Sequence, residues 1–215
     1  MLIEEIMVKE VTTLFPTDTV RDALEIMRDK KVRHLPVITD NRAVVGIITD
    51  RDLKEVIPST LAEYKGKDIY ETKVSTIMTE NPITGHPMDF VEESAVIFYR
   101  NKIGSLPIVS NNKLVGIITE TDLLYKYIEL TGAHQPGSQI EVRVPDTPGI
   151  LFEVSKVFFE QKTNVQSVLV YPDKLNAASK ILVIRIKTMN PLNVIEGLKI
   201  GGFEVLWPKF PGMDL

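Results

Sequence analysis

The chain has 215 residues, of which none is cysteine and one is tryptophan. The lack of cysteine excludes a disulfide framework, a thiolate metal site and a cysteine nucleophile. No apolar run approaches the roughly 18 residues that a membrane-spanning helix needs. The opening stretch, residues 1–6, carries two acids where a secretory signal would carry basic residues. We therefore expect a cytoplasmic protein with no membrane partner.

Positive charge is also scarce. Lys and Arg number 25 against 29 Asp and Glu, which gives a net charge of -4 at pH 7. Nucleic-acid binding usually draws on clustered Lys and Arg to displace counterions from phosphate. We expect no nucleic-acid partner. The hydrophobic share of 44%, by contrast, is ordinary for a globular protein with a real core.

Signatures of catalysis are missing as well. The three histidines, His34, His86 and His134, are scattered without the spacing of metal ligands. The chain contains neither a Gly-x-Ser-x-Gly nucleophile motif nor a Walker-type phosphate loop. We expect no catalytic residue, no metal site and no catalytic cofactor, and hence a protein that is not an enzyme.

An internal repeat organises the first two thirds of the chain. The octapeptide GIITDRDL at 46–53 recurs as GIITETDL at 116–123, with six of eight positions identical. Upstream, Leu35-Pro36-Val37 matches Leu106-Pro107-Ile108, and Ile6-Met7 matches Ile77-Met78. A repeat of this length indicates two copies of one structural unit.

Each copy has the same predicted outline. A short extended piece precedes a helix, whose apolar stripe is Val20, Ala23, Leu24 and Met27 in the first copy and Val91, Ser94, Ala95 and Phe98 in the second. Two β-rich runs follow, 35–38 and 44–49 in the first copy, and a second helix opens at the Thr-x-x-Asp. One β-α-β-β-α unit of about 60 residues buries little surface, so two should pack together.

This tandem arrangement resembles a pair of CBS domains, also called a Bateman module. The resemblance covers about residues 1 to 130. We predict a first CBS repeat at 1–60, a connection at 61–76 and a second repeat at 77–131. It implies a regulatory protein that binds adenine nucleotides or related adenosyl ligands.

The Thr-x-x-Asp pairs, Thr49 with Asp52 and Thr119 with Asp122, allow two interpretations. Their spacing is that of a helix capping box, which is a purely structural role. A carboxylate also accepts hydrogen bonds from the vicinal hydroxyls of a ribose, and a helix N-terminus favours phosphate. In proteins similar to this one, these positions hold the ribose of the adenosyl ligand.

Other ligand contacts follow from position in the repeats. We expect an adenine pocket, although core packing is the simpler role for each apolar member; its residues are Thr12, Thr13, Val37 and Ile48 in one copy and Ile83, Thr84, Ile108 and Ile118 in the other. Arg33, His34 and Arg51 stand where the second copy has Gly104, Ser105 and Thr121. These cations suit a phosphate, or simply a solvated surface, and the sequence does not tell which ribose site they serve.

The last third reads as a separate domain after a predicted linker at 132–137. Alternating and helical patterns predict the order β-α-β-β-α-β, with a first helix whose stripe is Leu151, Val154, Val157 and Phe158. This order, with Asp146-x-Pro148-Gly149-x-Leu151 after the first strand, resembles the ferredoxin-like ACT domain, placed at 138–215. The predicted fold class is therefore mixed α/β (α+β).

The Pro148-Gly149 pair has two possible roles. It suits a tight strand-to-helix turn. Its second possible role is an amino-acid site, in which Asp146, Pro148, Gly149 and Leu151 form a ligand loop and glycine lets the ligand reach the backbone. The resemblance implies that ACT sheets join edge to edge, so a homodimer is expected.

The order of CBS, CBS and ACT resembles the acetoin utilization protein family of the AcuB type. That resemblance implies a link to acetoin use and a partner enzyme of acetyl-CoA or acetoin metabolism. The expected regulatory ligands are AMP, ADP, ATP or S-adenosylmethionine. The alternatives are a constitutive dimerising scaffold without ligand and a regulatory subunit of a separate metabolic enzyme.

Overall fold

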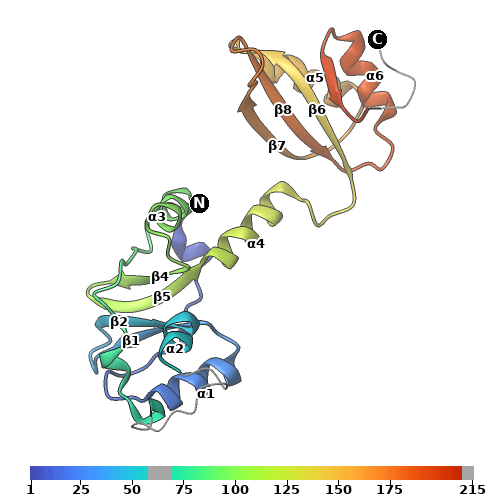
Figure 1. Ribbon diagram of the computed structural model, residues 1–215. Helices are drawn as coiled ribbons and strands as arrows, with labels where there is room; N and C mark the ends of the chain where they lie inside the picture. Colours follow the sequence, from blue (N-terminus) through green and yellow to red (C-terminus); the bar gives the residue numbers. More distant parts are fainter. Residues whose placement is uncertain (58–68, 210–215) are drawn as a thin grey trace. The chain divides into compact units, whose positions relative to one another are not determined.

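The computed structural model describes residues 1–57 and 69–209, which form two compact units, Met1–Leu124 and Tyr125–Leu215 (Figure 1). Residues 58–60 of the predicted first repeat, 61–68 of the predicted connection and 210–215 of the predicted ACT domain lie outside this description. Across the described part of the chain, no helix is long and apolar enough to cross a membrane.

The first unit contains the two copies of the repeat, and each has the predicted β-α-β-β-α outline. The first copy comprises α1 (Val20–Lys30), β1 (His34–Ile38), β2 (Val44–Thr49) and α2 (Asp50–Val56), and the second comprises α3 (Val91–Asn101), β4 (Ser105–Ser110), β5 (Lys113–Thr119) and α4 (Glu120–Thr131). Each leading extended piece supplies a single parallel bridge, Leu14 to Val37 and Gly85 to Ile108. Both β pairs are antiparallel hairpins.

The predicted helix stripes form the two cores with one exception. Val20, Ala23 and Met27 are buried in the first copy, where Leu24 packs at the margin. Val91, Ser94 and Phe98 are buried in the second copy, but Ala95 is exposed. Ala95 follows Ser94 by about 100° around the helix, which turns it away from the sheet.

The two copies exchange their leading segments. Ile3, in the 3-10 helix η1 (Ile3–Glu5), is buried in the core of the second copy, and Val8 bridges to Ile117 of β5. Conversely, Val74 is buried in the core of the first copy, and β3 (Thr79–Glu80) pairs with β2. Val74 belongs to η3 (Val74–Thr76), which follows η2 (Ile69–Glu71). The first unit is therefore interlocked.

A glycine in each copy makes this exchange possible. A Cβ on Gly46 would lie 2.3 Å from the sulfur of Met78, and a Cβ on Gly116 would lie 2.5 Å from the sulfur of Met7. Gly46 and Gly116 are the glycines of the two GIIT motifs, and Met7 and Met78 are the methionines of the two Ile-Met motifs. The repeated sequence thus encodes contacts between the copies as well as within them.

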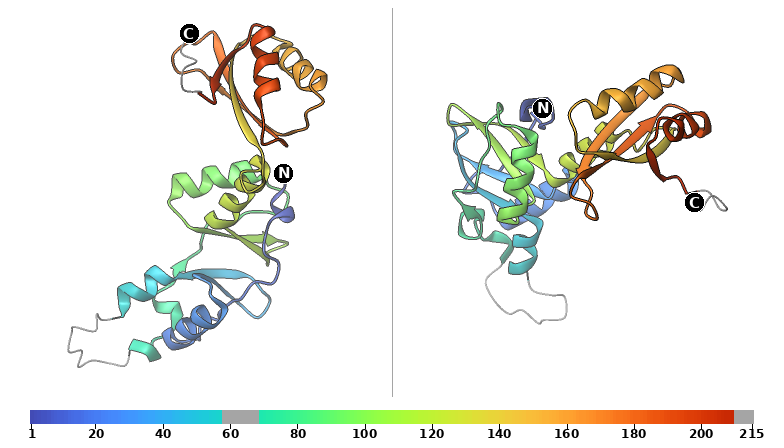
Figure 2. Two further views of the ribbon diagram at one scale, coloured as in Figure 1. Left: turned by 90° about the vertical axis from the view of Figure 1, so that its right-hand side faces the viewer. Right: turned by 90° about the horizontal axis from the view of Figure 1, so that it is seen from above.

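The second unit has the predicted β-α-β-β-α-β order. Its elements are β6 (Ser138–Pro145), α5 (Ile150–Glu160), β7 (Val165–Pro172), β8 (Ser179–Ile186), α6 (Leu192–Ile200) and β9 (Glu204–Trp207). The strands form one antiparallel sheet in the order β7-β8-β6-β9, and both helices cover the same face of it (Figure 2). Alternate β6 residues, such as Ile140 and Val142, are fully buried under the helices.

One member of the predicted α5 stripe is misplaced. Leu151 is exposed, whereas Val154, Val157 and Phe158 are buried as expected. Ile150 takes the fourth place and packs against the core. Positions 150, 154 and 157 follow the spacing of one helix face, and position 151 is turned off that face.

Candidate functional site

The two Thr-x-x-Asp motifs build the same helix start. Thr49 donates from its backbone N and its Oγ1 to Asp52 Oδ2 at 2.7 and 2.8 Å, and Asp52 N donates to Thr49 Oγ1 at 3.3 Å. Thr119 and Asp122 repeat this with distances of 2.7, 2.7 and 3.3 Å. The capping boxes expected as the simpler role are therefore present in both copies.

Each box uses only one carboxylate oxygen. Within residues 1–57 and 69–209, Oδ1 of Asp52 and Oδ1 of Asp122 accept no hydrogen bond. Both side chains are half-buried. A carboxylate held rigidly by one oxygen offers the other to a ligand hydroxyl without losing its cap. The structural role and the ribose role are therefore compatible.

The start of each hairpin is joined to the start of the following helix. Asp50 N donates to Arg33 O at 3.0 Å, and Glu120 N donates to Gly104 O at 3.2 Å. These bonds bring Arg33 and His34 to the N-terminal turn of α2, beside Asp52. The matching residues of the second copy, Gly104 and Ser105, meet the N-terminal turn of α4 in the same way.

His34 lies where the two copies meet. A Cβ on Gly104 would be 3.0 Å from His34 Nε2 and 3.9 Å from a Glu120 oxygen. Burial lowers the pKa of His34, and Arg33 lowers it further, while the carboxylates of Asp50, Glu120 and Asp52 oppose that shift. The imidazole of the first copy therefore faces the helix start of the second.

The two arginines are placed differently from His34. Arg33 and Arg51 are exposed, and neither forms an ion pair with another described residue. Arg33 is near enough to affect the pKa values of His34 and Asp50. The structure thus gathers Arg33 and His34, and leaves both guanidinium groups available to an anion or to solvent.

The predicted adenine residues fall into two groups. The apolar residues Val37, Ile48, Ile108 and Ile118 are fully buried in the two cores, so their side chains have the packing role. Thr12 and Thr13 are half-buried, and Ile83 and Thr84 are exposed. Ile83 and Thr84 precede Gly85, which bridges to Ile108, so this extended piece lies beside β4. A base in this region would meet these threonines and strand backbone.

The predicted ACT ligand loop is exposed and ordered by local contacts. Asp146 pairs with Lys180 at 2.7 Å and its backbone N donates to Ala178 O at 2.9 Å. Gly149 precedes α5 with φ of 87°, a left-handed conformation that glycine adopts readily. Pro148 and Leu151 are exposed on either side of it. The turn role is thus present, and open space remains beside Gly149.

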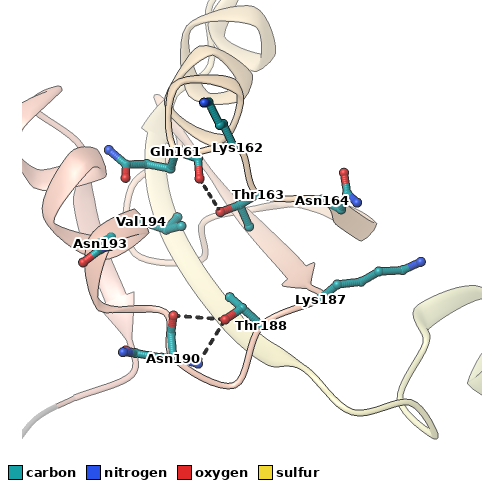
Figure 3. Close-up of a pocket in the computed structure, with 9 residues that line it drawn as sticks. All are labelled: Gln161, Lys162, Thr163, Asn164, Lys187, Thr188, Asn190, Asn193 and Val194. Carbon is teal, nitrogen blue, oxygen red and sulfur yellow. Dashed lines mark hydrogen bonds between the residues drawn. The ribbon is translucent and has the colours of Figure 1, made fainter.

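Two hollows of the second unit were not predicted from the sequence. One, of about 330 Å³, is lined by Gln161, Lys162, Thr163, Asn164, Lys187, Thr188, Asn190, Asn193 and Val194 (Figure 3). The other, of about 450 Å³, is lined by Ser138, Gln139, Met189, Asn190, Pro191, Leu192, Trp207 and Pro208. In Figure 3 the ammonium groups of Lys162 and Lys187 point in different directions, so they do not converge on one anion. No sequence motif marks the residues that line these hollows.

Comparison with protein families matches both parts of the chain. Residues 3–59 and 74–129 match the model of the CBS domain, and residues 138–196 match that of the ACT domain. Among curated relatives, the chain is 34% identical over 122 residues to an inosine-5′-monophosphate dehydrogenase of Methanocaldococcus jannaschii, over 56% of this chain and 22% of that protein. It is 31% identical to a CBS domain-containing protein of Dictyostelium discoideum, over 64% of this chain and 99% of that protein.

The chain thus spans nearly all of the Dictyostelium protein but about a fifth of the dehydrogenase.

Solved structures resemble part of the chain. A protein described as an acetoin utilization protein (AcuB) from Vibrio cholerae has a TM-score of 0.54 at 30% identity, covering 63% of this chain and 96% of that one. The CBS domain pair of protein MJ0100, in complex with 5′-methylthioadenosine and S-adenosyl-L-methionine, has a TM-score of 0.52 at 26% identity, with 63% and 98% coverage. CBSX2 in complex with AMP has a TM-score of 0.51 at 27% identity, with 59% and 96% coverage.

Proposed function

Because this chain belongs to the CBS-domain family, with two CBS domains followed by an ACT domain, it is a regulatory, ligand-sensing protein, and we propose that its ligand is adenosyl. The candidates are AMP, ADP, ATP and S-adenosylmethionine, and the protein acts without catalysis of its own. The supporting observation is that Asp52 and Asp122 each hold one carboxylate oxygen in a cap and leave the other available. Complexes of similar CBS pairs with AMP and with S-adenosyl-L-methionine support the same class of ligand.

Each predicted residue has a proposed role in that site. Thr49, Asp52, Thr119 and Asp122 bind ribose hydroxyls. Arg33, His34 and Arg51 bind phosphate, and the place of His34 against Gly104 supports a phosphate that lies between the two copies. The adenine lies along the backbone of the leading extended pieces. There Thr12 and Thr13 of one copy are half-buried, and Ile83 and Thr84 of the other are exposed, so a ligand can reach them.

The decisive experiment is a thermal-shift titration of the full chain with AMP, ADP, ATP and S-adenosylmethionine. A ligand specific to the folded state raises the melting temperature, by roughly 2.7 kcal/mol of stability at a concentration of 100 Kd. We expect the shift to be lost in Asp52→Ala or Asp122→Ala.

Asp22→Ala is the matched control. Asp22 forms the same capping box with Thr19 at the start of α1, at 2.7 to 3.2 Å, but in no predicted ligand site. It should lower the basal melting temperature as the other two variants do and keep the ligand shift. A wild-type protein that responds to none of the four ligands would contradict the sensor.

The phosphate role has its own test. The double variant Arg33→Ala/Arg51→Ala should lose the preference for AMP over adenosine, because two unpaired guanidinium groups are removed. Arg28→Ala, which removes an exposed arginine of α1, should keep that preference. Equal AMP affinity in wild type and double variant would rule out the phosphate role.

A second candidate is a constitutive scaffold. It is favoured by the hydrogen bonds between Thr and Asp within each capping box, because helix stability alone explains both motifs. In either case we propose a homodimer, and for the ACT domain either dimerisation or an amino acid at the loop Asp146, Pro148, Gly149 and Leu151. A thermal shift with one amino acid that is lost in Gly149→Val would support the second role.

The cellular role is proposed from the resemblance to the Vibrio cholerae protein. We propose a cytoplasmic regulator linked to acetoin utilization, acting on a partner enzyme of acetyl-CoA or acetoin metabolism. Deletion of its gene should slow growth on acetoin or butanediol and leave growth on glucose unchanged. Equal growth on all three would remove the acetoin link without touching the ligand proposal.

A further inference from the structure

Helix α4 differs from its counterpart α2 in length and burial. It has 12 residues against 7, and all 12 are described. Leu53 of α2 is 1% exposed, whereas no residue of α4 is buried, and Tyr127 and Leu130 are 57% and 58% exposed. An isolated helix of this length is marginal in water, since packing normally supplies its stability. In α4 only Leu123, in the first turn, packs against a core, that of the second copy, so the rest of the helix depends on what holds its two ends.

The N-terminal end is held by the capping box of Thr119 and Asp122, which is also half of the proposed ligand site. A ligand that fixes the Asp122 carboxylate would stabilise this cap. Loss of the cap would leave the first backbone N–H groups of α4 without their partner.

The C-terminal end is held by a set of contacts that we call the clasp: residues 131–135 with Gln166, Ser167 and Arg185. Ser167 Oγ donates to Thr131 O at 2.8 Å, Arg185 Nη2 donates to Gln135 O at 2.6 Å, and Gln166 Nε2 donates to Gln135 Oε1 at 3.0 Å. Ser167 and Arg185 are paired across β7 and β8. The segment predicted to be a linker is thus fastened to the ACT sheet.

The clasp is tight but incompletely satisfied. A Cβ on Gly137 would lie 2.4 Å from the carbonyl oxygen of Ile186, so the segment runs directly against β8. Gln166 Oε1 and Arg185 Nε are buried and have no hydrogen-bond partner among the described residues. Unpaired buried polar atoms cost free energy. These two atoms therefore lower the net stability of the closed clasp.

We propose that α4 is a two-state coupling element between the second CBS repeat and the ACT domain. Stabilising the cap at Thr119 and Asp122 stabilises the helix and closes the clasp, and opening the clasp loosens the cap. The helix transmits this because its turns form cooperatively and no residue beyond Leu123 packs it against a core. The coupling itself needs no ligand, while its use as a signal rests on the proposed adenosyl site. Coupling of this kind is reciprocal.

The test is hydrogen exchange, followed by mass spectrometry, of the full chain without ligand. In Ser167→Ala/Arg185→Met, exchange in residues 131–138 should accelerate by about tenfold, as expected for loss of the anchoring hydrogen bonds. Exchange in residues 119–125 should rise several-fold. Residues 49–56, which carry the same capping box on a helix that ends at Val56, are the internal control and should not change.

Either of two results in the double variant would overturn the coupling. One is unchanged exchange at 131–138, and the other is faster exchange at 131–138 while exchange at 119–125 stays unchanged. Ser155→Ala, which removes a serine bond within α5, should affect neither segment. Unchanged exchange of β8 shows that the sheet is intact. If β8 is affected, Gln135→Ala removes the Gln166 bond of the clasp without altering the sheet, and it must accelerate exchange in both segments, by less than the double variant does.

Failure of the proposed function has a different signature. If the chain binds no adenosyl ligand, AMP and S-adenosylmethionine will leave exchange at 119–125 unchanged in the wild-type chain. The coupling is still tested in that case, because the variants are measured without ligand. A ligand that slows exchange at 119–125 must also slow it at 131–138, and slowing confined to the first segment would contradict the coupling.

Discussion

The two repeats share a backbone plan but differ in what they present to their surroundings. Both have the same capping box and the same hairpin. On the helices, Glu25 and Arg28 of α1 correspond to Val96 and Tyr99 of α3, and all four are exposed. Repeat pairs therefore provide an internal reference: what is equal serves folding and the common site, and what differs marks a specialised role.

The strongest destabilisation is expected at the glycines that let the copies interlock. Gly116→Ala places a methyl group 2.5 Å from Met7 Sδ and 3.2 Å from the Val8 carbonyl, whereas the three atoms nearest to the methyl group of Gly46→Ala all belong to the side chain of Met78. We expect both to destabilise by about 1–3 kcal/mol, with Gly116→Ala the worse because backbone yields less than a flexible side chain. Urea denaturation measures this.

A specific interaction between the copies can be separated from a general glycine effect. Adding Met7→Ala to Gly116→Ala should cost less than the sum of the two single changes, because the clash is relieved. Strictly additive costs would show that Gly116 does not depend on Met7.

The next effect concerns the caps. Thr49→Ala and Thr119→Ala should each destabilise by about 1 kcal/mol, and Thr→Ser at either position should recover most of it, because a hydroxyl oxygen is restored. The two caps should differ in their effect on the helices that they begin. Thr119→Ala should unfold more of α4 than Thr49→Ala unfolds of α2, since α2 retains buried Leu53. Hydrogen exchange of the two helices provides the measurement, and equal local losses would contradict it.

Substitutions on the exposed face of α3 should change stability less, but they should change the association of the chain measurably. Val96→Glu/Tyr99→Arg copies the residues of the first repeat to positions where the side chains are 46% and 85% exposed. Stability should change by less than about 0.5 kcal/mol. If α3 contributes to the proposed homodimer, light scattering will show a lower mass than for wild type; an unchanged mass would exclude α3 from the interface.

The smallest effect is a pH dependence that only the first repeat carries. Burial lowers the pKa of His34 in the folded chain, so the unfolded chain binds that proton more readily. The free energy of unfolding should therefore fall as pH drops below about 6.5, and full stability should be present above it. His34→Ser, which copies the second repeat, should flatten the slope between pH 7.5 and 5.

Exposed His86 provides the control for that prediction. His86→Ser should leave the slope of stability against pH as steep as in wild type. The carboxylate of Asp50, whose pKa is lowered mainly by its hydrogen bond to Lys54, affects stability only at more acidic pH. A slope that persists in His34→Ser would mean that another group carries it.

Patterns within a few residues were readable from the sequence. The Thr-x-x-Asp boxes depend on contacts between residues three apart, and the α1 stripe on one helix face, so both were predicted correctly. Leu151 was misplaced because its neighbour Ile150 is also apolar, and Ala95 because it adjoins the buried Ser94. Spacing alone does not show which of two adjacent residues faces the sheet. Four of the expected adenine residues are core side chains, which is the simpler role that we also expected for them.

The repeat, the element order of both domains and the two helix caps follow from local spacing and periodicity in the sequence. The folded chain, by contrast, packs Met7 on Gly116, turns His34 toward Gly104 and fastens the segment after α4 through Arg185. Those contacts join residues 50 to more than 100 positions apart. Such pairs leave no mark in local spacing, because they depend on where the folded chain brings distant surfaces together.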